Sequence, residues 1–264
     1  MRGVRRMWRL DGGAIQINDL SLFSDTFGYQ GERRQLVVSC YLIEHTNGML
    51  LWDAGLPRHL LGVALTDAPK SARLERTLVE QLREIGIEAN AIDRVAVSHY
   101  HMDHLGQVGD FAQATLMMGR LDYLALRDEA TIPDTDPELI RPWLHGHRPV
   151  DLVSGDRDVY GDGTVRMLAM PGHTPGHYVL LVRLAGAGDV LLSGDTAVFA
   201  QQLADRAIAP ANSDRAQSLA SMSRLLEVSR QLNATLIVQH DADDVGKLPR
   251  FPLAASWRTG GVQC

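Results

Sequence analysis

The apolar residues of this sequence fall in short runs that are separated by turn residues. Residues 36–55 read LVVSCYLIEHTNGMLLWDAG, with one apolar run on each side of Asn47-Gly48. This dipeptide favours a tight type I′ turn, so the segment predicts an antiparallel hairpin that ends in a loop. Further short apolar runs predict strands near 94–98, 114–118, 164–170, 178–184, 189–193 and 234–239.

Other segments carry their apolar residues at helical spacing. In residues 71–86, Leu74, Leu78, Leu82 and Ile85 recur on one face, and Gly86 favours a helix end. Shorter and longer helical patterns follow near 119–127 and 213–231. Strands that are paired by hairpins and interrupted by helices indicate an α/β fold in which two sheets carry helices on their outer faces.

Residues 128–150 interrupt this pattern, because Pro133, Pro137, Pro142 and Pro149 exclude a single regular element. We interpret this stretch as an insertion that forms a lid or a substrate loop. The sequence has no internal repeat, low-complexity tract or linker that would divide it. Residues 1–264 are therefore predicted to form a single domain.

Composition narrows the choice of partners and of metal ligands. The net charge is -6 and both signs are mixed along the chain, so no basic stripe is available to follow a nucleic-acid backbone. Cys40 lies in an apolar run and Cys264 is the last residue, which excludes a disulfide framework and a cysteine-rich metal site. Any metal site must use histidines and carboxylates.

The first residues, MRGVRRMWRL, are followed by DGGAIQIND rather than by an apolar stretch, and no apolar run reaches the length of a membrane span. We expect a cytoplasmic protein that does not associate with membranes. A signal peptide removed before this sequence begins would leave no trace in it.

The densest chemical motif is H-x-H-x-D-H, formed by His99, His101, Asp103 and His104 directly after a predicted strand. Alternate side chains of an extended segment share a face, so His99 and His101 can converge on one ion. Asp103 and His104 lie where the chain must turn and can reach a second ion. Burying three imidazoles and a carboxylate is costly unless something binds them, which favours a metal site over a polar loop with chance histidines.

Three more apolar strands end in a residue that can bind a metal. The strands near 165–170, 190–192 and 236–239 lead to His173, Asp195 and His240, respectively. A single histidine after a strand is more often a hydrogen-bonded loop residue. Four strand ends with the same design indicate one shared site.

The order H-x-H-x-D-H, PGHTPGH, SGD and a late strand-ending histidine resembles the metallo-β-lactamase superfamily over nearly the whole chain. The resemblance implies an αββα sandwich with a dinuclear site, two divalent ions that are expected to be zinc, at one edge of the sheets. It implies His99, His101 and His173 on the first ion, Asp103, His104 and His240 on the second, and Asp195 bridging both.

Features outside these ligands favour one branch of the superfamily. True β-lactamases lack the bridging carboxylate of Asp195, residues 241–264 leave no room for the C-terminal helical region of glyoxalase II, and the flavodoxin domain of flavodiiron reductases is missing. The chain resembles N-acyl homoserine lactonases, with LDGG at 10–13 and YLIEH at 41–45 before WDAGLP. One departure is Val198, where such lactonases carry a tyrosine.

The resemblance implies a hydrolase of the quorum-quenching type that opens a lactone ring by attack of hydroxide on the carbonyl carbon. Asp103 and Asp195 are the candidate catalytic residues, Asp103 as a proton shuttle as well as a ligand. The same core also suits a phosphotriesterase or an arylesterase. A mononuclear-iron sulfur dioxygenase and a non-catalytic metal-binding module remain further alternatives. A homodimer is expected by analogy.

Aromatic and apolar residues on loops are candidates for the wall of a substrate pocket, because they suit an acyl chain. They can equally pack only within their own loops. The candidates are Phe23, Phe27 and Tyr29 in the first loop, Leu60 and Leu61 after DAGLP, Trp143 in the insertion, and Val198.

Some polar residues near the motifs are expected to support the site rather than to bind metal. His177 is predicted to act behind the ligands. Asp53 is expected either to hydrogen-bond a ligand histidine or to stabilise a turn. The remaining histidines, His45, His59, His145 and His147, are predicted to be surface or loop residues.

Overall fold

The two longest strands, β1 (Val4–Ile17) and β2 (Arg34–His45), pair antiparallel and form the centre of the fold. They belong to a computed structural model that describes residues 3–128, 132–184 and 188–256. On one side of this pair the sheet continues through four strands, the first antiparallel to β2 and the others parallel to it in turn. These strands are β3 (Gly48–Trp52), β5 (Arg94–Ala96), β6 (Thr115–Gly119) and β7 (Val150–Val153).

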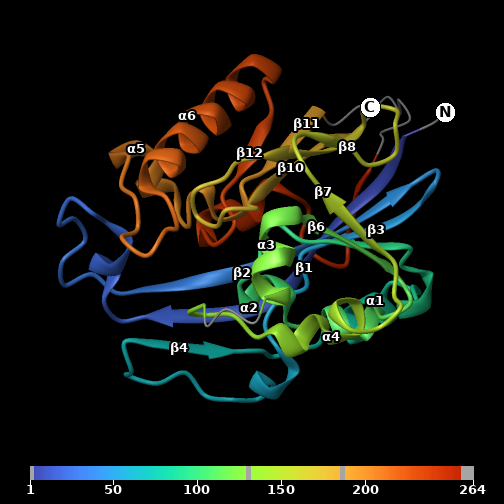
Figure 1. Cartoon of the computed structure of the whole chain (residues 1–264), viewed down its shortest axis with the longest axis horizontal. Helices are drawn as coiled ribbons and strands as arrows, with labels where there is room; N and C mark the ends of the chain where they lie inside the picture. Colours follow the sequence, from blue (N-terminus) through green and yellow to red (C-terminus); the bar gives the residue numbers. More distant parts are fainter. Residues whose placement is uncertain (1–2, 129–131, 185–187, 257–264) are drawn as a thin grey trace, which may run out of the picture.

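The other half of the strand system is joined to β1 by one parallel pairing, between Val4 and Leu184. Its strands are β8 (Arg157–Asp158), β9 (Val165–Ala169), β10 (Tyr178–Leu184), β11 (Gly188–Leu192) and β12 (Thr235–Ile237). Two short strands, β4 (Lys70–Arg73) and β13 (Ala255–Ser256), pair antiparallel with β1. The two halves face each other and leave their outer faces to the helices (Figure 1).

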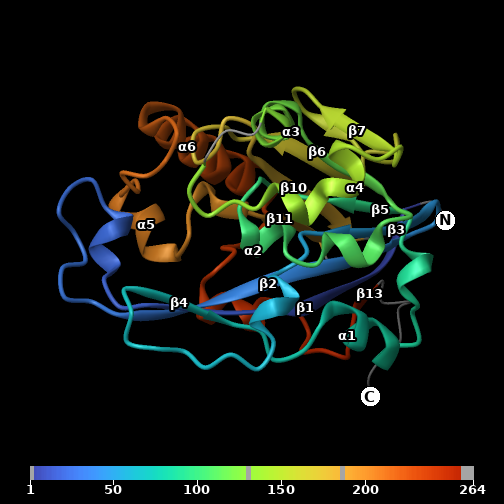
Figure 2. The ribbon, with the colours of Figure 1, turned by 60° about the horizontal axis from the view of Figure 1, so that its bottom comes forward.

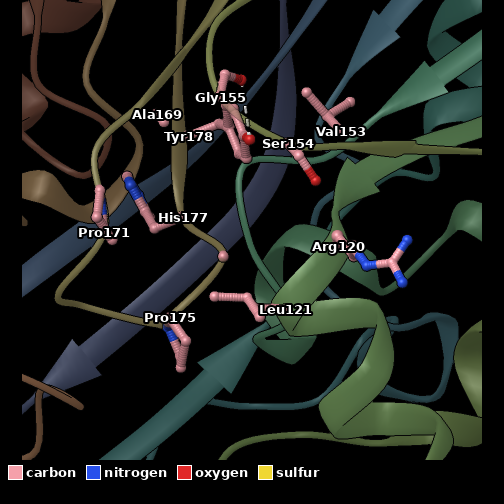
Figure 3. Close-up of a pocket in the computed structure, with 11 residues that line it drawn as sticks. Arg120, Leu121, Val153, Ser154, Gly155, Ala169, Pro171, Pro175, His177 and Tyr178 are labelled. Carbon is pink, nitrogen blue, oxygen red and sulfur yellow. Dashed lines mark hydrogen bonds between the residues drawn. The ribbon is translucent and has the colours of Figure 1, made fainter.

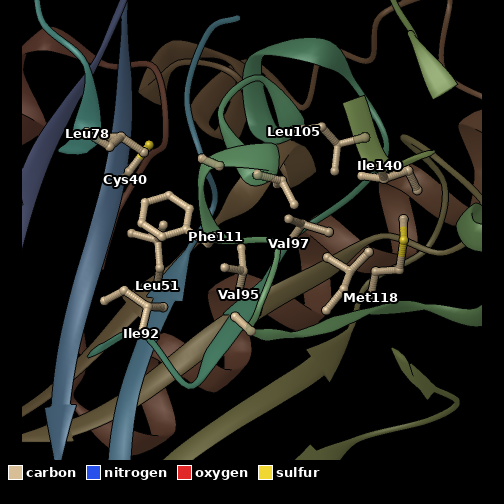
Figure 4. Packing of buried hydrophobic residues seen from close by; sticks show 14 of the residues in the cluster. Cys40, Leu51, Leu78, Ile92, Val95, Val97, Leu105, Phe111, Met118 and Ile140 are labelled. Carbon is tan, nitrogen blue, oxygen red and sulfur yellow. The ribbon is translucent and has the colours of Figure 1, made fainter. Parts of the chain in front are cut away.

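Alternation along the strands shows which side chains lie between the sheets. On β2, Tyr41 and Ile43 pack in one buried cluster with Leu180 and Val182 of β10, which lies in the other half. Their neighbours on β2, such as Cys40, point the opposite way into a second cluster with Leu78, Phe111 and Leu105 (Figure 4). Because side chains alternate between the faces of a strand, this arrangement is a sandwich of two sheets.

Helices cover both outer faces, as the turned view makes clear (Figure 2). We call the half that contains β3, β5, β6 and β7 the first sheet and the half that contains β8 to β12 the second sheet. The helices on the face of the first sheet are α1 (Leu78–Glu84), α2 (Met102–Leu105), α3 (Arg120–Arg127) and α4 (Arg141–Leu144). The face of the second sheet carries α5 (Ala200–Asp205) and α6 (Arg215–Leu232), and Leu225 of α6 packs on Val179 and Leu181 of β10. The predicted αββα sandwich is confirmed.

Seven short 3₁₀ helices complete the described elements; they are Leu20–Phe23, Arg58–Leu60, Ala89–Ala91, Val108–Phe111, Pro137–Ile140, Gly194–Thr196 and Ala242–Lys247. In the described part of the chain, no helix combines the length and the apolar character needed to cross a membrane.

The predicted helix at 71–86 is wrong over its first half. Residues 70–73 form β4, which pairs with β1, and Leu74 packs in a cluster with residues of β1 and β2. The helix begins only at Leu78 because Thr77 forms a capping box with Glu80: Thr77 Oγ1 accepts from Glu80 N at 3.2 Å, and Glu80 Oε2 accepts from Thr77 N at 2.7 Å.

The predicted hairpin at 36–55 is present, but its turn lies one residue earlier than expected. His45 pairs with Gly48, so the two loop residues are Thr46 and Asn47. Gly48 is the first residue of β3, with a φ of 131° that glycine adopts without steric cost. In the predicted insertion at 128–150, residues 132–150 hold a 3₁₀ helix, α4 and the start of β7, while residues 129–131 lie outside the described residues, as does Cys264.

Candidate metal centre

Each of the seven candidate ligands lies just beyond the end of a strand. After β5 the chain bends over residues 98–101, and α2 begins after His101, so that Asp103 and His104 occupy its first turn. His173, Asp195 and His240 follow β9, β11 and β12. Because β11 and β12 are parallel neighbours, their last residues meet at the same edge of the sheet.

His99, His101, His173 and Asp195 form the first group of ligand atoms, which we call the three-histidine group. His99 Nε2 lies 2.9 Å from His101 Nδ1, and His173 Nε2 lies 3.1 Å from the same atom. Asp195 Oδ2 is 3.4 Å from His173 Nε2. Ring nitrogens of three histidines thus converge on one point, which is the arrangement needed to share an ion.

Asp103, His104 and His240 form the second group, which we call the two-histidine group. Asp103 Oδ2 lies 3.5 Å from His104 Nε2 and 3.6 Å from His240 Nε2. The other oxygen of Asp195, Oδ1, is 3.0 Å from His240 Nε2 and 3.4 Å from His104 Nε2. Asp195 therefore turns one carboxylate oxygen toward each group and lies between them.

The donor atoms of both groups fit a divalent cation. His104 Nε2 is buried and has no hydrogen-bond partner within the described residues, a costly state that a bound ion removes. Imidazole nitrogens and carboxylate oxygens are typical zinc ligands. Burial lowers the pKa of His99, and burial and His173 lower the pKa of His101 to about 3, so both rings are neutral and have a lone pair to offer.

The two-histidine group differs in charge. Burial acts to lower the pKa of His104, but the carboxylates of Asp103, Asp53 and Asp195 raise it above its usual value. Burial acts to raise the pKa of Asp195, yet His240 and His104 hold it well below its usual range. Without a metal, protons on the histidines balance these carboxylates, and a bound cation replaces those protons.

Hydrogen bonds from behind fix the orientation of three ligand rings. Asp53 Oδ2 lies 3.0 Å from His104 Nδ1, and Asp53 Oδ1 accepts from Ser98 N at 2.7 Å. His240 Nδ1 lies 2.8 Å from Val37 O. These contacts turn the opposite ring nitrogens toward the ligand groups. The predicted contact of Asp53 with a ligand histidine is thus present.

The third ring, His173, is held by Asn212, whose Oδ1 lies 3.0 Å from His173 Nδ1. Sequence reasoning did not select Asn212, because an asparagine before a helix gives no sign of which ring it will face. His177 Nε2 accepts from Asp195 N at 2.8 Å, so His177 lies behind Asp195 rather than among the ligand atoms. His45, predicted at the surface, is buried: its ring stacks on Tyr160 and bonds Asp162 at 2.9 Å.

A cavity of about 540 Å³ lies over both groups. Its floor contains His101, Asp103, His173, Asp195 and His240. Apolar side chains from several elements form much of the wall: Ile15, Ile17, Leu22, Phe23, Leu36, Ile132 and Val198. The cavity therefore combines an apolar wall with a floor of metal-binding side chains.

Of the predicted pocket residues, only Phe23 and Val198 line this cavity. Trp143 is 2% exposed in the core, and its Nε1 donates to Ala114 O at 3.2 Å, so its predicted role in the pocket is wrong. Phe27 is 85% exposed outside the cavity. Tyr29 is buried against Phe199, with its hydroxyl donating to Asp205.

Leu60 and Leu61 also lie away from this cavity. Leu60 packs against the buried cluster that contains Leu56 and Leu74, and Leu61 forms an isolated bridge with Leu74. Ile15 and Ile17, which sequence reasoning did not select, share the cavity face of β1. Their alternate spacing was a detectable signal, but it did not tell which face of β1 meets the ligands.

A second cavity of about 340 Å³ lies behind the loop that carries His173. Figure 3 shows Leu121 of α3 beside Pro175 and His177 of this loop. Arg120 is the charged residue of its wall. In the described part of the chain, the groups of side chains that can hold a metal are the two already described, and neither lies in this second cavity.

Comparisons with known proteins agree with this geometry. The sequence model of the metallo-β-lactamase superfamily matches residues 33–240, a stretch that includes all seven candidate ligands. The chain is 29% identical to the N-acyl homoserine lactonase AttM of Azorhizobium caulinodans over 228 residues, or 81% of this chain and 85% of that protein.

Two further relatives share almost the whole length of the chain. It is 27% identical to the N-acyl homoserine lactonase AiiA of Bacillus thuringiensis subsp. kurstaki over 259 residues, or 94% of this chain and 98% of that protein. A solved N-acyl homoserine lactone hydrolase, with the product N-hexanoyl-L-homoserine at its catalytic metal centre, is similar at a TM-score of 0.82 and 25% identity, covering 96% of this chain and 100% of that one.

Proposed function

The chain belongs to the metallo-β-lactamase superfamily, and from this premise we propose that it is a metal-dependent hydrolase that opens the ring of N-acyl homoserine lactones. The observation that carries the proposal is the position of Asp195 between two groups of ligand atoms on the floor of a largely apolar cavity. Relatives similar over most of their length are described as N-acyl homoserine lactonases, which supports this substrate class.

The seven ligands are proposed to hold two zinc ions. His99, His101 and His173 would hold one, Asp103, His104 and His240 would hold the other, and Asp195 would serve both. When bound, the ions supply a Lewis acid for the ester carbonyl and make water acidic enough to attack at neutral pH. The presence of two groups of ligand side chains also argues against a mononuclear-iron dioxygenase, which needs ligands for only one ion.

The chain's own residues handle the substrate and the proton. Asp103 lines the cavity floor, and we assign it as the carboxylate that accepts a proton from the attacking water. The water oxygen bonds to the carbonyl carbon, the bond from that carbon to the ring oxygen breaks, and Asp103 returns the proton to that oxygen. The product is a hydroxy acid, which loses its acidic proton at neutral pH.

The apolar wall is proposed to bind the acyl chain. Ile15, Ile17 and Leu36 come from β1 and β2, Phe23 comes from the 3₁₀ helix Leu20–Phe23, and Val198 comes from the loop before α5. An apolar wall with a polar floor favours a neutral, amphiphilic substrate over a highly charged one. A homodimer, which the resemblance implied, stays a prediction that sedimentation velocity can test.

A titration at constant pH tests the proposal, because opening a neutral lactone releases acid. Lactones of several acyl-chain lengths are compared with an aryl ester and an aryl phosphotriester, and the zinc content is measured in the same preparation. We expect hydrolysis of the lactones by protein that holds two ions. Protein with both ions that hydrolyses the aryl ester or the phosphotriester but no lactone contradicts the proposed substrate class. Protein that saturates at one ion contradicts the dinuclear site.

A further inference from the structure

Asp122 is a fully buried carboxylate that belongs to neither ligand group. It lies in the first turn of α3 and is 0% exposed. Its Oδ2 accepts a hydrogen bond from Thr174 Oγ1 at 2.7 Å, and its Oδ1 accepts one from Gly176 N at 2.6 Å. The backbone of Tyr100 also acts on this carboxylate and lowers its pKa.

The groups that act on Asp122 come from the two segments that carry the three-histidine group. Tyr100 stands between His99 and His101, and Thr174 directly follows His173. These segments are about 70 residues apart in sequence, and one carboxylate is bonded to the second and interacts with the backbone of the first. Asp122 therefore sits where it can fix the position of His173 relative to the other two histidines.

Around Asp122, the backbones of two segments approach so closely that no other side chain could pack between them. A Cβ atom placed on Gly176 would lie 2.7 Å from Asp122 N, and one placed on Gly119 would lie 2.0 Å from Gly176 O. The backbones of α3 and the loop 171–177 thus touch, with no space for an intervening side chain. Leu121 and Pro175 lie beside each other in the wall of the second cavity (Figure 3).

A carboxylate suits this place better than a neutral side chain. Both oxygens of this carboxyl group accept hydrogen bonds, whereas an asparagine has one acceptor oxygen and would turn its NH₂ group toward one of the two donors. These bonds offset part of the cost of burying the group, whose pKa burial raises to about 7. The site is therefore built around an acceptor.

We propose that Asp122 is a positioning residue that sets the affinity of the three-histidine group for its metal ion. This inference rests on the proposal that the group binds zinc. The two-histidine group has its own supports in Asp53 and Val37, so its affinity does not depend on Asp122. The effect of changing Asp122 is therefore specific to one of the two ions.

Zinc titration of metal-free protein tests this without reference to substrate. In a His240→Ala background, which weakens the two-histidine group, Asp122→Asn is expected to raise the Kd of the remaining ion by roughly 10- to 100-fold, the range seen when partners of metal ligands are changed. Thr174→Val, which removes one of the two hydrogen bonds, is expected to have a smaller effect in the same direction.

Asp158→Asn is the matched control, because Asp158 also accepts from two backbone amides, those of Gly161 and Gly163, but touches neither ligand segment. It is expected to leave the Kd unchanged. If Asp122→Asn does not fold, as judged by circular dichroism, Thr174→Val carries the test alone. Unchanged zinc affinity in the folded Asp122 or Thr174 variants, or an equal loss in Asp158→Asn, overturns the proposal. An absence of lactone hydrolysis by the wild type bears only on the proposed function.

Discussion

The floor and the wall of the main cavity are built in different ways. The floor is made of side chains that follow strand ends and are held from behind, as His173 is by Asn212. The wall is collected from β1, β2, the 3₁₀ helix Leu20–Phe23, the segment 132–134 and the segment 209–213. A floor of this kind is fixed by local strand geometry, whereas the wall depends on how distant segments meet.

This difference teaches where chemistry and specificity are encoded. Strand ends hold ligand atoms in fixed directions, so changes there act on metal binding and on catalysis. Loops tolerate substitution, so changes in the wall act on the choice of substrate. Substitutions in each region separate the two roles.

The largest effect is expected at Asp195, the residue shared by both ligand groups. Asp195→Ala removes one oxygen from each, and we expect the protein to retain roughly one ion instead of two. Loss of several kcal/mol of transition-state stabilisation corresponds to a fall in kcat of roughly 10⁴-fold. Elemental analysis and steady-state kinetics on the same preparation measure both quantities. A variant that keeps two ions and its activity contradicts the bridging role.

The next largest effect is a loss of stability, and it distinguishes a residue of the core from a residue of the cavity wall. Trp143→Ala is expected to lower the free energy of unfolding by about 3–5 kcal/mol, the usual cost of removing a buried tryptophan. Because Trp143 lies away from the cavity, the ratio of KM values for long-chain and short-chain lactones should stay constant. Denaturant unfolding and kinetics on the folded fraction test both points.

Phe23→Ala is the counterpart within the wall. It should raise KM more for long-chain than for short-chain lactones, because the lost contact scales with buried apolar area. If Trp143→Ala instead changes the chain-length preference and Phe23→Ala does not, the distinction between core and wall fails.

The sequence predicted the floor far better than the wall, for a physical reason. A ligand that follows a strand is placed by the direction of that strand, so the motifs alone placed His173, Asp195 and His240 beyond the ends of three strands. Trp143 looked like a pocket residue because it is an aromatic residue in a proline-rich stretch. Only the packing of α4 against Phe111 and Ile140 shows that its ring is part of the core.

Contacts with distant segments explain the other differences between the predicted and the observed structure. Leu74 fits a helical pattern with Leu78 and Leu82, but pairing of residues 70–73 with β1 and the cap at Thr77 override that pattern. Likewise, a surface position was the simplest prediction for His45, since stacking on Tyr160 depends on a partner more than a hundred residues away. Local propensity is a weak guide wherever a distant segment supplies the partner.

A smaller effect, on stability, is expected from pH. Burial raises the pKa of Asp122 to about 7, although bonds from Thr174 and Gly176 act to lower it. The folded state therefore binds a proton that the unfolded state has lost between about pH 4 and pH 7, so this group's contribution to stability falls as the pH rises through that window.

Asparagine does not titrate in this range, so the comparison with Asp122→Asn isolates the effect. In metal-free protein, the stability of the wild type relative to Asp122→Asn should fall by up to about 4 kcal/mol from pH 4 to pH 7. Denaturant unfolding at several pH values measures this difference. A difference that is constant or grows with pH refutes the assignment.

The smallest effect is expected at Tyr100, and it tests what replaces the tyrosine that lactonases of this type carry where this chain has Val198. Val198 lines the cavity but cannot donate a hydrogen bond, and Tyr100 is the tyrosine that lines the same cavity. A donor that is the principal stabiliser of a developing oxyanion is typically worth about 2.7–4 kcal/mol, whereas a Lewis acid on the carbonyl oxygen can supply several kcal/mol by itself. We expect the Lewis acid to suffice, so Tyr100→Phe should lower kcat by less than about tenfold, or ~1.4 kcal/mol.

Tyr29→Phe is the control, because its hydroxyl bonds Asp205 and its ring lies outside the cavity. Steady-state kinetics with the zinc content of each variant decide the matter: a loss of a hundredfold or more in Tyr100→Phe alone, at unchanged zinc content, would mean that this hydroxyl has taken over the missing role and that the wall, as well as the floor, takes part in the chemistry.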